Sequence, residues 1–449
     1  MKLPLSPPPM KGLWEDNSPD RFFELMSLGI GPEPSGSYLH WDQLRHKPTP
    51  KDVSHAEWWL MVRHARSASS QKLPFADPDG NPFTFTTTES LLRRLHQMDR
   101  DASGSIQADA PITTDANRDR YIINSLLEEA ITSSQLEGAS TTTQEAKDML
   151  RSGRRPRDRS EMMILNNYNA MSFIRENRNE PLSIEFLLEL HRILTKDTLD
   201  DPTGSGRWRR PDEDVTVQDN RDGTLLYKPP HANLIPSRIK RLIVFANKED
   251  HVPFIHPVVC AVIMHFMLSY EHPFIDGNGR TARALFYWYM AKTHYWLIEY
   301  ISISKIIKKA PIKYAKSFLY VENDANDLTY FLDNQFDVIL ESIAALFEYL
   351  RKKTEEFRKT ESIMRSELQR LLNHRQIAVI SHALKHPGFN YTIQSHARSH
   401  SVTYQTSRTD LLKLSELELL DKFKRGKAFI FQSPRDLVSK IEHMESARI

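Results

Sequence analysis

Residues 272–283 read HPFIDGNGRTAR and place a histidine, a carboxylate, a Gly-Asn-Gly turn and two arginines within twelve positions. Asp276 offers the hard oxygen ligand that Mg²⁺ prefers. Gly277, Asn278 and Gly279 allow a tight turn whose backbone N–H groups can point at an anion. The helical pattern RTARALFYWYMAK follows, and a helix N-terminus favours phosphate. The stretch therefore predicts a polyphosphate site.

The side chains around this turn are suited to binding phosphate and removing a proton. Arg280 and Arg283 are three positions apart, so they share one helix face and can bind neighbouring phosphates. His272 precedes Pro273, which disfavours helix, and is expected where a helix ends and the loop begins. A neutral imidazole there can take a proton from an attacking hydroxyl. A basic, glycine-containing surface turn is the weaker interpretation of the same residues.

The stretch resembles the signature of the Fic family, HPFx(D/E)GNGRxxR, at every fixed position. The resemblance implies a protein adenylyltransferase that moves AMP from ATP to a Ser, Thr or Tyr hydroxyl of a target protein. In that reaction His272 is the general base, and Asp276 holds Mg²⁺ between the α- and β-phosphates. Residues 277–279 form the anion hole, while Arg280 and Arg283 anchor the phosphates. The implied fold is mainly α, a Fic-type helical core with a β-hairpin flap.

A second motif is SSQLEG at residues 133–138, where Ser133 and Glu137 lie four positions apart on one helix face. Alone, it is compatible with an ordinary helix end carrying a solvated glutamate. The segment resembles the (S/T)xxxE(G/N) inhibitory motif of Fic proteins, in the arrangement where the inhibitory helix precedes the catalytic core. The resemblance implies that Glu137 pairs with Arg283 and denies that arginine to the γ-phosphate of ATP.

Two further features are less specific. Residues 214–230 contain two β-rich runs around a turn at 220–223, which predicts a hairpin. The hairpin is either merely structural or, as the resemblance implies, a flap that aligns the target by strand addition. Tyr314 resembles the first tyrosine of the family segment beyond the signature, which helps to form the nucleotide pocket. Simple packing explains Tyr314 equally well.

Composition limits the class of protein. The chain has 449 residues, which predicts two or three domains, and Lys+Arg 60 against Asp+Glu 58 gives no whole-chain argument for nucleic acid or membrane. Cys260 is the single cysteine, so no internal disulfide is expected, and a buried thiol in a reducing compartment fits. The N-terminus has no apolar core of signal-peptide length, and the most apolar segment, residues 258–268, is too short to span a membrane. A cytoplasmic protein without a membrane partner is expected.

Hydrophobic periodicity divides the chain into successive regions. Ser160 and Ser183 are expected as helix N-caps, residues 76–85 as a turn-rich loop, and residues 305–322 as a helical segment. The predicted regions are an N-terminal accessory helical region at 1–110, a Fic domain at 111–345 with its inhibitory helix at about 118–138, a linker helix at 346–370 and a winged helix-turn-helix domain at 371–449.

The winged-helix prediction depends on three helical segments at 374–386, 391–400 and 402–420, followed by a basic hairpin at 421–432. Residues 374–431 contain nine Lys/Arg and four Asp/Glu, a local net charge of +5 on a near-neutral chain. Weak DNA binding is expected from a wing that contacts phosphates. The wing cations are Lys422, Lys424, Arg425 and Lys427, and the candidate recognition-helix residues are Thr403, Tyr404, Gln405 and Arg408.

Alternatives to AMP transfer remain open. Glu137 can instead position a water that removes AMP, or the donor can be UTP, GTP or CDP-choline. A DNA-binding regulator whose Fic core is secondary is an alternative from another class. His191, His256 and His265 lack the spacing of zinc ligands and are expected as core or surface histidines. Auto-modification and a homodimer are further expectations.

Overall fold

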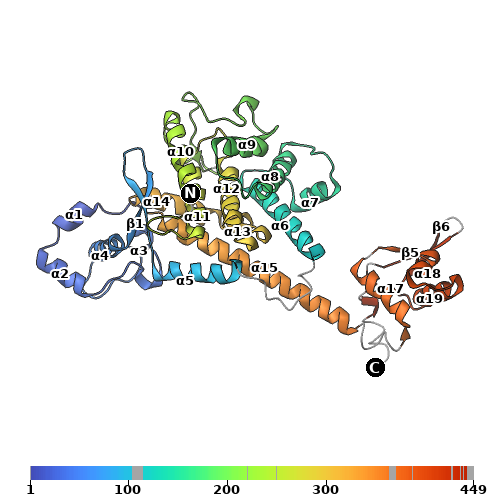
Figure 1. The fold of residues 1–449 in the computed structure, drawn as a ribbon. Helices are drawn as coiled ribbons and strands as arrows, with labels where there is room; N and C mark the ends of the chain where they lie inside the picture. Colours follow the sequence, from blue (N-terminus) through green and yellow to red (C-terminus); the bar gives the residue numbers. More distant parts are fainter. Residues whose placement is uncertain are drawn as a thin grey trace. The chain divides into compact units, whose positions relative to one another are not determined.

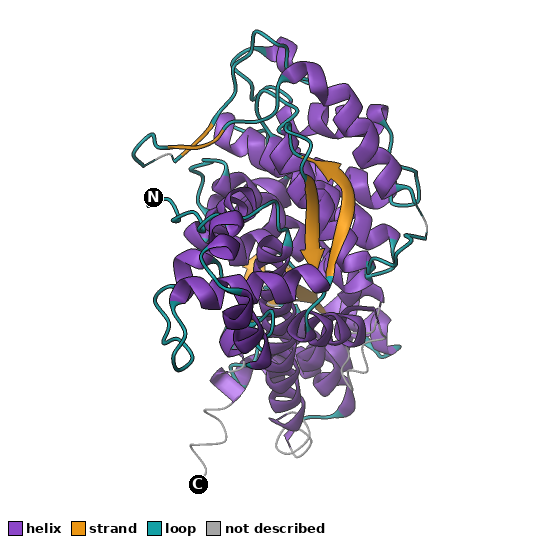
Figure 2. Ribbon diagram, turned by 90° about the vertical axis from the view of Figure 1, so that its left-hand side faces the viewer, coloured by secondary structure: helices purple, strands orange, loops and turns teal. Residues whose placement is uncertain are grey.

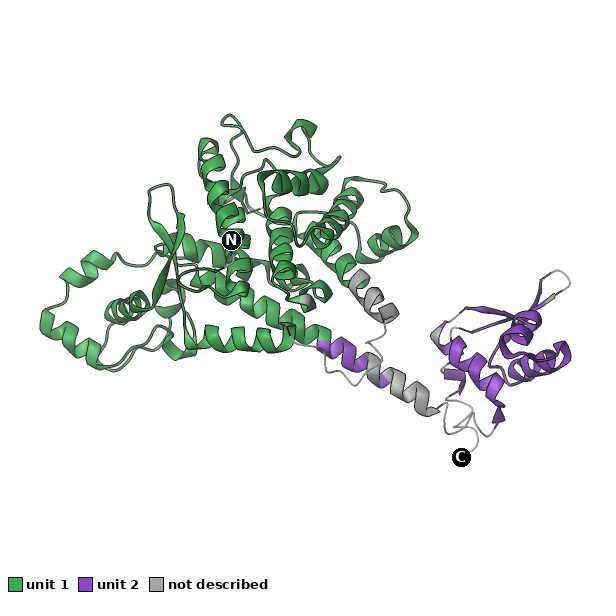
Figure 3. Cartoon of the chain, in the orientation of Figure 1, with its two compact units in different colours: residues 1–346 green, residues 347–449 purple. Residues whose placement is uncertain are grey.

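A computed structural model describes residues 2–103, 115–219, 221–248, 250–363, 371–386, 388–425, 428–434, 436–437 and 439–441. Helices predominate (Figure 1), and the described strands form three small sheets (Figure 2). The chain divides into two compact units, residues 1–346 and 347–449 (Figure 3). The prediction of a mainly α fold is confirmed.

The first unit begins with short helices, whose apolar side chains form a cluster of their own, and a hairpin that shares a core with the helices that follow. The buried Tyr38 hydroxyl donates to Asp327 (2.6 Å), and Arg66 donates to the Tyr330 hydroxyl (2.7 Å). These contacts fix the N-terminal segment to the end of the unit. Its elements are α1 (Met10–Glu15), α2 (Pro19–Ser27), α3 (Trp41–Leu44), α4 (His55–Ala68), β1 (Ser70–Ala76), β2 (Pro82–Thr86) and α5 (Glu89–Met98).

The hairpin of β1 and β2 is a feature that the sequence did not reveal. Residues 76–85, expected as a loop, contain most of β2. Leu73, Phe75, Phe83 and Phe85 alternate along the two strands and are buried. Prolines in both strands and the DPDG turn hide this short alternation, although proline is tolerated in an edge strand.

Among the remaining helices of the first unit, α6, α8 and α9 pack against α12, and α10 packs against α11. Ser183 caps its helix as predicted, because its side chain accepts from the Phe186 N–H (3.0 Å). Ser160 does not: Asp158 is the N-cap of α8, and Ser160 lies in the first turn. The helices are α6 (Asp115–Leu136), α7 (Thr143–Ser152), α8 (Arg159–Glu176), α9 (Ile184–Thr195), α10 (Ile235–Ala246), α11 (Pro257–Glu271), α12 (Asn278–Lys292), α13 (Ile303–Lys309) and α14 (Pro311–Asn323).

Residues 305–322 form two helices rather than one, because Pro311 cannot continue α13 and instead begins α14. The long helix α15 (Thr329–Ile363) contains the end of the first unit and the start of the second.

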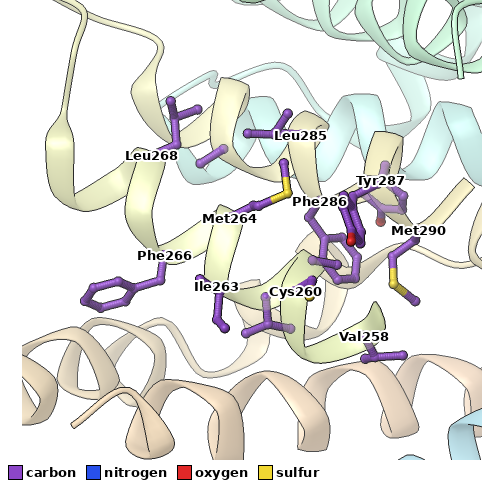
Figure 4. Packing of buried hydrophobic residues seen from close by; sticks show 14 of the residues in the cluster. Val258, Cys260, Ile263, Met264, Phe266, Leu268, Leu285, Phe286, Tyr287 and Met290 are labelled. Atoms are coloured by element: carbon purple, nitrogen blue, oxygen red, sulfur yellow. The ribbon is translucent and has the colours of Figure 1, made fainter. Parts of the chain in front are cut away.

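Helix α11 is buried on nearly all sides and forms the centre of the core together with α12 (Figure 4). Cys260 lies among these apolar side chains, as expected, and burial raises the pKa of its thiol to about 12. The thiol is therefore protonated and unreactive at neutral pH. Within the described residues, no helix has both the length and the hydropathy needed to cross a bilayer.

The hairpin predicted at 214–230 is present as the antiparallel pair β3 (Val217–Gln218) and β4 (Leu225–Tyr227). Its position is fixed by Tyr227, whose hydroxyl donates to the Tyr270 carbonyl (3.0 Å) near the end of α11. Asn220, in the predicted turn, lies outside the described residues. The hairpin thus lies close to the loop that follows α11.

Among the described residues of the second unit, three helices follow the end of α15, together with a three-stranded antiparallel sheet in the order β5-β7-β6. Tyr391 and Thr392, expected in a helix, belong to β5, because Tyr391 pairs with Phe431 and Thr392 caps the next helix. The elements are α17 (His374–Lys385), β5 (Asn390–Thr392), α18 (Ile393–His400), α19 (Tyr404–Glu416), β6 (Asp421–Arg425) and β7 (Ala428–Gln432).

Candidate active site

The loop between α11 and α12 presents His272 where the sequence places it, at the end of a helix. His272 adopts the left-handed conformation (φ 46°) as the C-cap of α11, which is strained for a residue other than glycine. Its Nδ1–H donates to the Ser269 carbonyl (3.3 Å), so Nε2 is the unprotonated nitrogen of the neutral ring. Burial lowers the pKa of His272 below its usual value. The ring is therefore neutral at pH 7 and suited to accepting a proton.

Asn278 holds the loop in its turn. Its Oδ1 accepts from the Phe274 N–H (2.9 Å), and its Nδ2 donates to the Phe274 carbonyl (2.8 Å). Asn278 was expected to contribute to an anion hole, and these two bonds give its side chain a second task, holding the loop backbone. Its backbone N–H lies at the start of α12, where it can face an anion.

His191, on α9, is a second residue that holds the loop in place. Its Nδ1 accepts from the Gly206 N–H (3.0 Å), and its Nε2–H donates to the Asp276 carbonyl (2.9 Å). The ring stacks on Phe274 at 3.7 Å between centroids. Burial lowers the pKa of His191 to about 4, so the ring stays neutral. The expectation of a core histidine is confirmed, but its contact with the loop was missed, because a single histidine on a helix has no identifying pattern.

Replacing His191 by phenylalanine is expected to weaken the loop while preserving the ring stack. The Asp276 carbonyl and the Gly206 N–H lose their partners, and each unsatisfied buried group costs about 1–3 kcal/mol. We expect the free energy of unfolding of the first unit to fall by about 2–4 kcal/mol, measured by urea denaturation followed through tryptophan fluorescence. An unchanged midpoint would mean that the two hydrogen bonds contribute nothing to the loop.

Asp276 and Gly277 are the last two residues of the loop before α12. The Asp276 side chain is 45% exposed, and its Oδ1 accepts from the Gly277 N–H (2.5 Å). Gly277 has φ 81°, and a Cβ at this position would meet Thr195 Cγ2 at 2.9 Å, so both the conformation and the space require glycine. The carboxylate is left open to solvent beside the N-terminus of α12.

Arg280 and Arg283, the two arginines of residues 272–283, are buried side chains of α12. Arg280 donates to the Leu194 carbonyl (3.0 Å) and lies 3.4 Å from Oδ2 of Asp276. Its Nε has no hydrogen-bond partner in the described part of the chain. Arg283 donates through Nε to Ser133 Oγ (2.9 Å) and through one terminal nitrogen to the Ser133 carbonyl (3.1 Å) and Glu137 (2.8 Å). Two segments about 150 residues apart thus meet at Arg283.

Glu137 occupies the place that an anion would take at the start of α12. A Cβ on Gly279 would overlap its Oε1, so the carboxylate lies directly over the first turn of the helix. Burial raises the pKa of Glu137, but the charges of Arg283 and Arg280 outweigh it and lower the pKa overall. Glu137 is therefore ionised, and the N-terminal end of the helix dipole favours it there.

Glu129 lies on α6 one turn before Ser133, and no motif marked it for a role in the site. Its buried carboxylate accepts from the Tyr287 hydroxyl (2.9 Å) on α12 and from the Ser302 hydroxyl (2.7 Å) ahead of α13. Residues 129 and 133 on α6 and residue 137, directly after its last turn, are spaced four apart, so all three face α12. Polar contacts therefore set the position of Glu137.

Tyr314 lies beside Arg283. Burial raises the pKa of the Tyr314 phenol to about 12, although the positive charge of Arg283 acts in the opposite direction. Its hydroxyl also contacts Nε2 of His265 (3.0 Å). His256 pairs with Asp99 (3.0 Å). None of the described His, Cys, Asp and Glu side chains gathers into a three-ligand metal cluster. The structure thus brings Tyr314 to the site and gives the histidines structural contacts.

Arg209 is a further residue that the sequence did not reveal. Its Nε donates to the His272 carbonyl and its backbone N–H to the Pro273 carbonyl, both at 2.8 Å. A terminal nitrogen donates to the Pro230 carbonyl at the end of the β3–β4 hairpin. One side chain therefore joins this hairpin to the His272 loop.

Comparison with known proteins gives a partial match over this part of the chain. Residues 181–290 match the Fic/DOC family. A protein adenylyltransferase Fic of Drosophila erecta is 36% identical over 104 residues, 23% of this chain and 19% of that protein. Another, of Drosophila persimilis, is 29% identical over 202 residues, 43% of this chain and 36% of that protein. The matches thus span about a fifth to a third of these relatives.

A solved structure extends the likeness of the fold. A Fic family protein from Desulfovibrio desulfuricans G20 superposes with a TM-score of 0.51 at 17% identity, over 78% of this chain and 97% of that one. At this identity the likeness concerns the fold alone. It includes much of the chain outside residues 181–290.

Proposed function

We propose that the chain, which matches the Fic/DOC family over residues 181–290, transfers AMP from ATP to a Ser, Thr or Tyr hydroxyl of a target protein. One observation carries the proposal: a neutral histidine, an exposed carboxylate and two buried arginines converge at the N-terminus of α12. The two arginines and the open N–H groups of this helix start are suited to a polyphosphate.

In the proposed reaction the target hydroxyl attacks the α-phosphorus of ATP. His272 Nε2 accepts the hydroxyl proton, the new O–P bond forms, and the bond from the α-phosphorus to the bridging oxygen breaks. Pyrophosphate leaves with both bonding electrons. Arg280, Arg283 and the N–H groups of α12 hold the phosphates in line, so positioning and charge neutralisation provide most of the rate gain.

Asp276 fits a magnesium site that is completed by the nucleotide. Mg²⁺ is usually bound by one or two carboxylates together with substrate phosphates and waters, and Asp276 is a half-exposed carboxylate beside the proposed phosphate site. When bound there, the metal neutralises charge on the α- and β-phosphates. Asp276 would hold it, while the His191 bond to the Asp276 carbonyl fixes the backbone that carries this ligand.

Asp276→Ala is expected to abolish AMP transfer and its dependence on Mg²⁺ together. The substitution removes the carboxylate and leaves the Asn278 and His191 bonds to the loop backbone intact, because neither uses the Asp276 side chain. Incorporation of AMP would be measured across a series of Mg²⁺ concentrations. Full, magnesium-dependent turnover in the variant would rule out the metal role of Asp276.

We infer that the observed contacts of Arg283 hold the enzyme in an inhibited state. Arg283 is needed for the γ-phosphate in the proposed site, but Glu137 and Ser133 already accept its hydrogen bonds. The Glu137 carboxylate also repels a phosphate from the first turn of α12. Release of α6 from this position would therefore free the site.

The assay for the proposed activity uses ATP labelled on different phosphates. Transfer of AMP adds label from the α-phosphate to protein, including the chain itself, and adds none from the γ-phosphate. Competition by unlabelled UTP, GTP and CDP-choline tests the donor. Incubation of an AMP-modified target with the wild-type chain tests the reverse role, in which Glu137 positions a water to remove AMP.

The β3–β4 hairpin is proposed as the flap that aligns the target. Both strands are short, and Leu225 at the start of β4 is 51% exposed. An extended target segment can pair with a free strand edge through backbone hydrogen bonds. Arg209 links the end of this hairpin to the His272 loop, so the paired hydroxyl would be held close to the base.

A weak interaction with duplex DNA is expected from the second unit. Lys422 and Lys424 lie on β6, whereas Lys427 and the side chain of Arg425 lie outside the described residues. On α19, Tyr404 is 62% exposed and Arg408 is exposed, so both are accessible to a base edge. Phosphate contacts weaken steeply with salt. In a gel shift, the full chain should retard duplex DNA at low salt and release it at moderate salt.

A chain with Lys422→Glu and Lys424→Glu should lose this retardation, because both changes place a negative charge where phosphate would bind. Absence of retardation by the wild-type chain even at low salt would instead favour a protein-docking role for this unit.

A further inference from the structure

A groove between β1 and α10 lies outside the proposed active site. Its volume is about 650 Å³, and it is lined by residues 71–74 of β1, one face of α10 and the loop that leads into α11. None of its lining residues belongs to the His272 loop or to the flap. We call it the β1–α10 groove.

The β1–α10 groove is strongly basic. Its fourteen lining residues include Lys72, Lys240, Arg241 and Lys248 but no Asp or Glu. None of these four cations forms an ion pair with another described residue. The whole chain has Lys+Arg 60 against Asp+Glu 58, so the excess of positive charge in the groove is a local feature. Cations gathered around a depression create a positive potential that attracts an acidic ligand.

The groove is also apolar between its cations. Leu73, Phe245 and Ile255 form buried parts of its lining, while Val244 and Val252 are 63% and 84% exposed. A polyanion such as nucleic acid needs the charges but gains nothing from these aliphatic side chains. A peptide that carries both carboxylates and apolar side chains would use both.

The outer edge of β1 runs along the groove. Residues 71–74 are consecutive in the lining, as expected for a strand edge rather than a strand face, since alternate residues line a face. The other edge pairs with β2 through Gln71 and Lys72. In the described part of the chain no backbone group pairs with the outer edge. Pro74 fits a free edge because it lacks an N–H, and it limits pairing by a further strand to residues 70–73.

The two walls of the groove are held together before any ligand binds. Arg238, on α10, donates to the Ala76 carbonyl at the end of β1 (2.6 Å) and pairs with the buried Glu271. The groove is therefore preformed, which reduces the entropy cost of binding.

We propose that the β1–α10 groove binds an extended, acidic peptide segment of a partner protein, which adds to the edge of β1 and places apolar side chains between the four cations. Backbone pairing provides affinity in such complexes, and the alternate side chains provide specificity. The site is separate from the flap, so a partner can be held there while a hydroxyl elsewhere on it reaches His272.

Fluorescence anisotropy with synthetic peptides tests the proposal without any catalytic readout. The probe is a fluorescein-labelled decapeptide in which Glu alternates with Val and Phe, and it should bind the full-length chain. Two peptides serve as comparisons: in one, serine replaces Val and Phe; in the other, lysine replaces Glu. Both should bind at least about tenfold more weakly, because each loses one of the two kinds of contact.

The matched protein variants carry equal changes of charge. Lys240→Glu with Arg241→Glu should weaken binding of the probe about tenfold or more, because both cations line the groove. Lys51→Glu with Arg155→Glu, at exposed positions outside the groove, should leave binding within about twofold. Circular dichroism and thermal midpoints of both variants confirm that they fold.

Three results would overturn the proposal. The first is no binding of the probe by the wild-type chain at low salt. The second is an equal loss of binding in the Lys51 and Arg155 variant, which would show attraction by net charge alone. The third is equally tight binding of a labelled dT10 oligonucleotide that the Lys240 and Arg241 variant also loses, which would assign the groove to nucleic acid.

Discussion

Glu137→Gly is expected to raise the rate of auto-modification with α-labelled ATP by about 10–100-fold over the wild-type chain. The substitution removes the carboxylate that accepts from Arg283 (2.8 Å) and overlies the start of α12. Hydrogen bonds to charged groups contribute about 1.5–3 kcal/mol, and about 1.4 kcal/mol corresponds to a tenfold change. Arg283 becomes free for the γ-phosphate, so both ATP affinity, measured calorimetrically, and turnover should rise.

Two companion variants separate this explanation from a general loosening of α6. Ser133→Ala removes the acceptor of Arg283 Nε (2.9 Å) but keeps the backbone carbonyl that accepts from the same guanidinium, so a smaller rise is expected. Glu129→Gln disturbs the docking of α6 on α12 without touching Arg283. A folded Glu137→Gly chain that is no more active than wild type would refute the inhibitory role.

The active-site loop was predictable because its chemistry is local. His272, Asp276 and the two arginines lie within twelve residues, and helix rules place them: proline ends one helix, and glycines begin the next. The contact between Glu137 and Arg283 joins segments 146 residues apart. Residue spacing cannot reveal such a contact, and the expectation came from the resemblance of two motifs to one family.

Two of the residues that were missed act through the backbone of their partners. His191 and Arg209 bind carbonyl groups of the His272 loop, and any residue can provide a carbonyl, so no pattern of residue types marks the pair. Glu129 was missed because its partners, Tyr287 on α12 and Ser302 just ahead of α13, lie far from it in the sequence. In each case the functional contact is set by tertiary packing.

The errors in secondary structure also have local causes. Asp158 competes with Ser160 for the N-cap of α8 and is favoured because its carboxylate accepts from the Glu161 N–H (2.8 Å). The β1–β2 hairpin is hidden by prolines at positions 74 and 82. These strands depend on contacts with α10 and with Asp327, just ahead of α15, rather than on their own propensity.

His272→Ala in the Glu137→Gly background is expected to lower AMP transfer by about 10²–10⁴-fold, the usual cost of losing a general base. Arg280, Arg283 and the N–H groups of α12 do not depend on the imidazole, so ATP affinity should stay within about twofold. The matched control is His46→Ala, at an exposed histidine outside the site. Loss of ATP binding together with catalysis would instead give His272 a structural role.

The pH dependence distinguishes these roles further. Burial places the pKa of His272 below the ordinary value of 6.5, so the ring stays neutral at pH 7 and becomes protonated only at lower pH. Transfer by the Glu137→Gly chain should fall as the pH decreases through a midpoint below 6.5. The residual activity of the His272→Ala chain should lack this acidic limb, because no imidazole remains to be protonated at the site of proton transfer. An identical limb in both chains would assign the titration to another group and remove His272 from the proton-transfer step.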